Sequence, residues 1–318
     1  MGVTIKGKTF TSTEQVTSTK LHQLVDDATF DTTAVDNTST ALSGGAIIVK
    51  DGGITPAKTS SAFAYGYRNL IINGRGFINQ RGYVSGTATT GSNQYTVDRW
   101  RVVTSGQNLT FSTSGITTTM TAPAGGCEQV IEGLSIAGGT HIITFTGTAT
   151  CTVDGVTRTS GQTFTLTAGT NCTVRFSSGT FTNVQVEAGS VASVYENRAY
   201  GLELALCQRY FYSIKSTSTG NYICGGGFST ATQAQGHVTF PVTMRVAPTV
   251  TGFSVSSPSH INVSGASTLT LSALTISGGV PSTTGVGLLG TVSGATTGVA
   301  GWFFTTTSGQ INFDGAEL

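Results

Sequence analysis

From Asn69 onward, short runs of β-branched and aromatic residues are separated by glycine-rich turns. A typical stretch is GTHIITFTGTATCTVDGVTRTSGQTFTLTAGTNCTVRFSSG, in which DG, SG, AG and GT pairs interrupt the runs at regular spacing. Short strands bounded by such turns are characteristic of antiparallel sandwiches and barrels. The pattern therefore predicts an antiparallel jelly-roll β-sandwich over residues 69–198.

Two segments have helical character instead. In TKLHQLVDDATF, apolar residues recur at helical spacing behind Thr19, a candidate N-cap, so we expect one small helix in the N-terminal segment. In YGLELALCQRYF, Leu202, Leu206 and Tyr210 recur every fourth residue among good helix formers. The letters LELAL also alternate, which leaves a strand open, but a short buried helix is favoured.

The chain is thus predicted to be mainly β and to have four parts. After residue 213 the Thr, Ser and Gly strand pattern returns, through HVTFPVTMRVAPTVTGFSV to GWFFTTTSGQINFDGAEL, and predicts a second β unit resembling a sandwich. The parts are an N-terminal segment and connector at 1–68, the jelly roll at 69–198, a helical connector at 199–212 and a C-terminal β domain at 213–318.

Composition supports a folded β chain and reduces the classes of partner that are expected. Only 10% of the 318 residues are charged, whereas 38% are apolar, with 16 Phe and 9 Tyr available for burial. The net charge of +1 gives no broad positive field, so neither nucleic acid nor an anionic membrane is expected as a partner. No signal peptide or membrane-spanning segment is expected either, because the longest aliphatic runs are only as long as AIIV at 46–49.

The five cysteines are odd in number, widely spaced and never form C-x-x-C. This pattern favours neither a disulfide framework nor a zinc site. We therefore expect free, buried thiols.

Residues 2–9, GVTIKGKT, fit the phosphate-binding pattern G-x-x-x-x-G-K-[ST] letter for letter. That loop requires a preceding strand and a following helix, yet the first glycine is residue 2 and FTSTEQVTST has no helical apolar stripe. The nearest candidate for a magnesium-binding acid, Asp51 in AIIVKD, is preceded by Lys50. We interpret the match as a β-turn that arose by chance.

Other catalytic patterns are weak. The four histidines lie in separate segments without i, i+4 spacing, and G-x-S-x-G does not occur. Paired carboxylates for glycoside hydrolysis cannot be identified without their separation in space. Acids of the jelly roll are expected to pair with Arg81, Arg99, Arg101 or Arg198 at strand ends, with catalysis, ion binding or a structural calcium as the open alternatives. These acids are Asp98, Glu128, Glu132, Glu187 and Glu196.

Aromatic residues supply the binding candidates. If YTVDRWRVV is a regular strand, Tyr95 and Arg99 share one face while Asp98 and Trp100 share the other. Trp100 fits a core position better than a sugar-stacking position. In GWFFTTT, three adjacent aromatic residues on one strand cannot all face a single core.

Several stretches resemble the jelly-roll module of bacteriophage tail-fibre and receptor-binding proteins. They are NLIINGRGFINQRG at 69–82, YTVDRWRV at 95–102, GCEQVIEGLSIAGGTHIITFTGTATCTVDG at 126–155 and VQVEAGSVASVYENRAYGLELALCQRYF at 184–211. The resemblance spans about 140 residues in order. The first 60 residues, with TSTKLHQLVDDATF and KDGGITPAK, resemble segments that attach such fibres to the particle. VTFPVTMRVAPTVT and INFDGAEL resemble their distal parts.

This resemblance implies a virion component: a homotrimeric, non-enzymatic tail fibre without a required cofactor, assembled in the cytoplasm of the bacterial host. Residues 1–60 would bind a tail, baseplate or adaptor protein, and the fibre would mediate host attachment by carbohydrate binding to surface polysaccharide. Two alternatives stay open, namely a purely structural head or collar fibre and a depolymerase that cuts capsule.

Two binding sites are hypothesised. In the jelly roll, Trp100 and Tyr95 would stack on a sugar, while Arg81, Asp98 and Arg99 would form hydrogen bonds. In the C-terminal domain, the hypothesis names Tyr222, Trp302 and Phe303.

Overall fold

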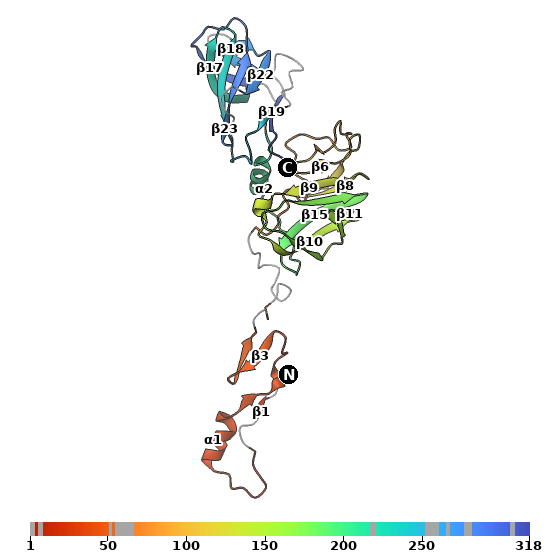
Figure 1. Cartoon of the computed structure of the whole chain (residues 1–318). Coiled ribbons are helices and arrows are strands. Elements are labelled where there is room, and N and C mark those ends of the chain that lie inside the picture. Colours follow the sequence, from red (N-terminus) through yellow and green to blue (C-terminus); the bar gives the residue numbers. More distant parts are fainter. Residues whose placement is uncertain are drawn as a thin grey trace. The chain divides into compact units, whose positions relative to one another are not determined.

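The computed structural model describes residues 4–5, 9–50, 53–54, 67–216, 221–251, 261–264, 268–276, 282–305 and 309–318. The chain is mainly β, with 43% strand and 9% helix, and its strands form antiparallel sheets (Figure 1). This confirms the fold class expected from the alternation of strand runs and turns. Residues 1–66 and 67–318 form two compact units. The division lies two residues from the boundary expected at 68, whereas the boundaries expected at 198 and 212 fall inside the second unit.

The first unit consists of small elements. Its single α-helix among the described residues begins after Thr17, whose hydroxyl accepts a hydrogen bond from the amide of Lys20. The helix was expected, but its N-cap lies two residues before Thr19. The elements are β1 (Thr4–Ile5), α1 (Ser18–Asp26), β2 (Thr29–Phe30), the 3-10 turn η1 (Thr32–Ala34), β3 (Thr40–Ser43) and β4 (Ala46–Val49), with β1 paired to β2 and β3 paired to β4.

Two antiparallel sheets form the jelly roll. The first has the strand order β13-β10-β15-β8-β7, and the second has the order β12-β11-β14-β9-β6-β5. The first sheet contains β7 (Thr110–Ser114), β8 (Thr117–Ala122), β10 (Gly139–Gly147), β13 (Gln162–Leu166) and β15 (Gly179–Ala188). The second contains β5 (Gln94–Tyr95), β6 (Arg101–Val102), β9 (Cys127–Ile131), β11 (Thr150–Val153), β12 (Val156–Arg158) and β14 (Cys172–Ser177).

Strand alternation and turn chemistry explain this sandwich. In β14, alternate residues are buried, so Val174 and Phe176 enter the core while Arg175 faces outward. Between β11 and β12, Asp154 and Gly155 both have positive φ, +48° and +78°, as a two-residue hairpin turn requires. The chain passes back and forth between the sheets from β8 to β15, with the 3-10 turn η2 (Gly133–Ser135) after β9.

The helix α2 (Tyr200–Gln208) follows the jelly roll and confirms the helical alternative for this segment. It leads into the C-terminal domain, which has a three-stranded sheet, β16-β25-β19, and a seven-stranded sheet, β21-β20-β24-β17-β18-β23-β22, drawn in cyan to blue in Figure 1. The strands are β16 (Tyr212–Ser216), β17 (Asn221–Thr230), β18 (Gln233–Thr239), β19 (Thr249–Thr251), β20 (Ile261–Ser264), β21 (Thr268–Thr270), β22 (Ala273–Ile276), β23 (Gly285–Thr291), β24 (Ala300–Thr305) and β25 (Gly309–Asp314).

Each part of the second unit has its own apolar core. The jelly-roll core surrounds Trp100, Phe176 and Phe181, whereas the C-terminal core includes Phe303 and Phe313. All five cysteines are free, and every one except Cys224 is buried, which confirms the expectation of free thiols. Burial raises the pKa of the Cys151 and Cys172 thiols to about 12.

The buried thiols predict a loss of stability at alkaline pH. An unfolded thiol ionises near pH 9.0, while the folded Cys151 and Cys172 stay neutral until about pH 12. Between these values only the unfolded chain releases thiol protons, so the free energy of unfolding falls as pH rises. Thiolate absorbance should therefore increase together with the loss of β circular dichroism. Complete thiol ionisation near pH 9 with the fold intact would contradict this expectation.

Candidate functional site

Trp100 lies in the core, not at a binding surface. Its side chain is fully buried, its ring centroid lies 5.1 Å from that of Phe181 and 6.0 Å from that of Phe176, and its Nε1–H donates to the Asn73 carbonyl at 2.9 Å. No face of the indole is left for a sugar. The hypothesis that Trp100 stacks on ligand is therefore wrong, and the core interpretation is confirmed.

The segment YTVDRWRVV is a hairpin and not one regular strand. Tyr95 in β5 pairs with Arg101 in β6, and the amide of Thr96 donates to the Trp100 carbonyl at 2.9 Å across the intervening loop. Arg99 has φ +71°, which places it in the left-handed region. The expected division of side chains between two strand faces therefore does not occur.

Asp98 and Arg99 are also structural. Asp98 is buried and accepts hydrogen bonds from the amide and the side chain of Gln80; burial raises its pKa, although Arg81 and these bonds act to lower it. The Arg99 guanidinium lies 3.6 Å from the Tyr210 ring centroid and forms an ion pair with Glu317. Neither side chain reaches solvent, so neither is available to a ligand as the hypothesis required.

Arg81 and Tyr95, in contrast, line one cleft of about 500 Å³. The Arg81 guanidinium lies 3.7 Å from the Phe211 ring centroid and 5.2 Å from that of Tyr95, so aromatic rings hold it in place. The cleft joins the jelly roll to β25 of the C-terminal domain. Its lining residues are Arg81, Tyr83, Asn93, Gln94, Tyr95, Phe211, Asn312 and Asp314.

A row of side chains extends from this cleft across the outer face of the six-stranded sheet. Thr152, Arg175, Glu128, Arg101 and Tyr95 are successive cross-strand partners, so they project on the same side. Glu128 is buried beneath its neighbours, because Arg101 donates two hydrogen bonds to one carboxylate oxygen and Arg175 donates to the other. All residues of the row except Tyr95 line a second cleft of about 570 Å³, and Asn93 belongs to both clefts.

Four carboxylates of the jelly roll pair with arginines, which confirms the structural interpretation, but of the expected partners only Arg101 and Arg198 take part, since Arg81 and Arg99 pair with Glu317. The pairs are Glu128 with Arg101 and Arg175, Glu132 with Arg209, Glu187 with Arg68, and Glu196 with Arg198. Asp98 differs, because its carboxylate is bound by Gln80. Pairing occupies these oxygens, so the groups that the polar row offers to a ligand are its hydroxyls and guanidinium groups, and the neighbouring cleft adds amides.

Aromatic residues of the C-terminal domain divide between surface and core. Trp302 in β24 is 57% exposed and Tyr222 in β17 is 73% exposed, and their ring centroids lie 6.0 Å apart. Phe303 between Trp302 and Phe304 is fully buried. The expected split of the three adjacent aromatics is confirmed, but Phe303 is a core residue and the hypothesis that it contacts ligand is wrong.

Clusters of metal-ligating side chains and long apolar helices are both absent from the described residues. No group of three or more His, Cys, Asp or Glu side chains is placed to hold a metal ion among these residues. Likewise, none of their helices is long and apolar enough to cross a membrane. Most of GVTIKGKT and the whole of Asp51 lie outside the described residues, so the expected turn is not described, although Thr4–Ile5 pairs with Thr29–Phe30.

No protein-family model, curated protein or solved structure matches the chain.

Several cleft residues were not found from the sequence. Asn93 and Gln94 look like ordinary loop residues, while Asn312 and Asp314 are more than 200 positions away from them. Their only sequence signal is that an amide side chain directly precedes the aromatic residue in each case, Gln94 before Tyr95 and Asn312 before Phe313. The cleft forms only because β25 places Asn312 and Asp314 beside the jelly roll.

Proposed function

We propose that the chain is a bacteriophage tail-fibre, receptor-binding protein that attaches the virion to host surface polysaccharide without catalysis. The observation that carries this proposal is the cleft around Arg81 and Tyr95, which combines aromatic rings with amide, carboxylate and guanidinium groups. Sugars present flat C–H faces and rings of hydroxyls, which stack on aromatic rings and bond to such planar polar groups.

The polar row on the six-stranded sheet offers further contacts beside the cleft. A polysaccharide is a repeating polymer, so adjacent clefts could each take one sugar unit of the same strand. The shared position of Asn93 supports such a continuous path. The exposed Tyr222 and Trp302 rings provide a separate stacking surface on the C-terminal domain.

A homotrimer is part of the proposal, and features of the first unit support an assembly role. All four residues of β4, the apolar sequence AIIV, are exposed, and α1 buries no residue. A two-stranded sheet is marginal alone, so these apolar groups suit cover by other chains or by a tail protein. Three sites per fibre would raise avidity by about 10² to 10⁴ over a single site.

Asn93→Gly tests the cleft. Asn93 is exposed and has φ +57°, which glycine adopts freely, so the variant removes the amide with little backbone cost. We expect at least about tenfold weaker retention on an array of bacterial surface polysaccharides, because a buried polar group of a bound sugar loses its partner. Binding of labelled, full-length protein is read after washing.

The control is Asn37→Gly, an exposed asparagine with φ +54° in the first unit. It should bind as the unchanged protein does. Equal binding by both variants would place the glycan elsewhere. Absence of binding to any polysaccharide by an intact trimer, checked by sedimentation, would favour a structural head or collar fibre, and release of reducing ends would favour a depolymerase.

A further inference from the structure

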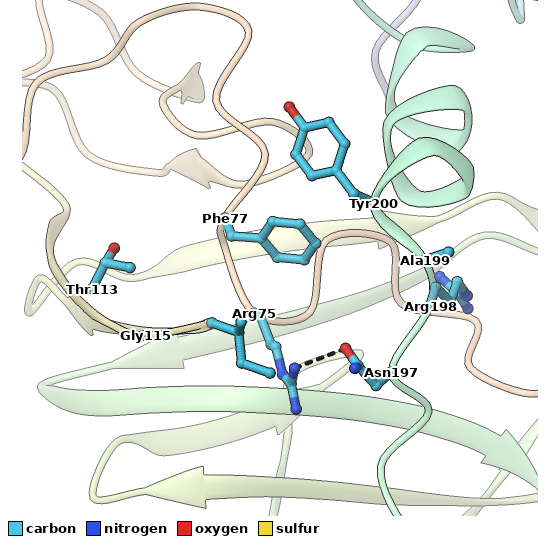
Figure 2. Close-up of a pocket in the computed structure, with 9 residues that line it drawn as sticks. Arg75, Phe77, Thr113, Gly115, Asn197, Arg198, Ala199 and Tyr200 are labelled. Atoms are coloured by element: carbon cyan, nitrogen blue, oxygen red, sulfur yellow. Dashed lines mark hydrogen bonds between the residues drawn. The ribbon is translucent and has the colours of Figure 1, made fainter.

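A third cavity, of about 410 Å³, lies beside the start of α2 and was not found from the sequence. Figure 2 shows its wall formed by Phe77 and Tyr200, with Arg75 and Asn197 close by. The β7–β8 turn closes another side with Ile116, which is 73% exposed. Its volume is within the range that holds a small ligand or one sugar unit.

Arg75 places a guanidinium group of fixed orientation at this cavity. Its Nε donates to the Asn183 side-chain oxygen at 2.8 Å, its Nη1 donates to that of Asn197 at 2.8 Å, and its guanidinium lies 4.7 Å from the Tyr195 ring centroid. Two neutral amides and a ring therefore fix the orientation of the group. Within the described part of the chain no carboxylate pairs with Arg75, in contrast to Arg81 or Arg101.

The remaining nitrogen, Nη2, has no acceptor among the described residues. A guanidinium that is fixed in place and lacks a counter-ion favours a planar anion such as a carboxylate. The backbone adds to this preference, because α2 begins beside the cavity and its N-cap, Ala199, has no side-chain cap. Glu203 in the first turn does not occupy the cavity, since its carboxylate is bound by Arg198 and the Asn73 amide.

The apolar wall defines the rest of the ligand. The Phe77 and Tyr200 ring centroids lie 5.9 Å apart with planes at 45°, and Tyr200 is 61% exposed. Exposed rings of this kind stack on the C–H face of a pyranose. The geometry points to a site for a carboxylate-bearing sugar, such as a uronic acid unit, with its ring on Tyr200 and Phe77 and its carboxylate on Arg75.

This inference rests on the proposed function, because it names the chemical class of one sugar in the receptor. It uses a cavity separate from the cleft at Asn93, so the inference about the acidic sugar and the proposed function can fail independently. Binding through Arg75 would weaken as salt rises, because ions screen an accessible ion pair.

The test uses the full chain with methyl glucuronide as the probe and methyl glucoside as its neutral counterpart, measured by saturation-transfer NMR and titration. We expect the glucuronide to bind at least about tenfold more tightly than the glucoside. Arg75→Gln should remove this preference. Arg158→Gln is the matched control, since Arg158 also lacks a carboxylate partner in the described residues yet lies on β12, and it should bind like the unchanged protein.

Two results would overturn the inference: equal affinity for both sugars, or a glucuronide preference that survives in Arg75→Gln. If Arg75→Gln loses its fold by circular dichroism, Tyr200→Ala replaces it, and unchanged glucuronide affinity in that variant is equally decisive. If either of these results is found while retention of a polysaccharide still depends on Asn93, this inference fails alone and the proposed function stands. Failure of every polysaccharide to bind would overturn the proposed function as well.

Discussion

Trp100→Ala is expected to lower the free energy of unfolding of the second unit by about 3–5 kcal/mol, as large core truncations do. The indole fills the centre of the jelly roll against Phe176 and Phe181, and its loss also leaves the Asn73 carbonyl without its N–H donor. Urea denaturation followed by circular dichroism measures the change. Polysaccharide binding should fall only in proportion to the fraction that unfolds.

The chain offers a matched control in its only other tryptophan. Trp302 is 57% exposed on β24, so Trp302→Ala should change the free energy of unfolding by only about 0.5 kcal/mol. Each variant keeps one indole as a fluorescence reporter. Trp100→Ala keeps the exposed Trp302, and Trp302→Ala keeps the buried Trp100. If both substitutions cost the same, the assignment of Trp100 to the core is wrong.

Glu317→Ala is the second substitution with a large expected effect. It leaves the Arg99 guanidinium, which is 1% exposed, without its carboxylate, and removing one partner of a buried ion pair costs about 3–5 kcal/mol. Arg81 also loses the Glu317 oxygen that lies 3.3 Å from its Nη1. We expect a lower urea midpoint and earlier proteolysis between the jelly roll and the C-terminal domain.

Two further variants separate charge from packing. Asp314→Ala removes a half-exposed partner of Arg81 at 3.5 Å, so its cost should stay below about 1 kcal/mol. The double substitution Arg99→Met with Glu317→Leu removes both buried charges and should recover much of the lost stability. A double variant that is less stable than Glu317→Ala alone would show that Arg99 contributes through its contact with Tyr210 instead.

The periodic parts of the fold could be predicted from the sequence. The DG pair at Asp154 and Gly155 predicts a hairpin, and alternation in CTVRFS predicts which side chains of β14 enter the core. Helix formers in YGLELALCQRYF identify α2 although its letters also alternate. These features are local, so neighbouring residues suffice to decide them.

The candidate binding surfaces could be predicted only in part, because they depend on contacts between distant residues. YTVDRWRVV reads as a strand, but Arg99 adopts a left-handed conformation that turns it into a hairpin and carries Trp100 inward. The same letters therefore place Tyr95 in a cleft and Asp98 in a buried network. Arg75 gives no sequence signal at all, since its significance is the absence of a carboxylate that only the folded structure can reveal.

The pairing of Arg99 with Glu317 also has a consequence for synthesis on the ribosome. The two residues are 218 positions apart, so the jelly roll is translated long before the carboxylate that neutralises its buried guanidinium. Leu318 likewise supplies the main-chain oxygen that Tyr95 and Arg101 bind. A nascent or truncated chain that stops before residue 317 holds an uncompensated cation in its first-formed domain. A chain that ends before this point is therefore expected to be less stable than the full chain, by about the 3–5 kcal/mol predicted for Glu317→Ala.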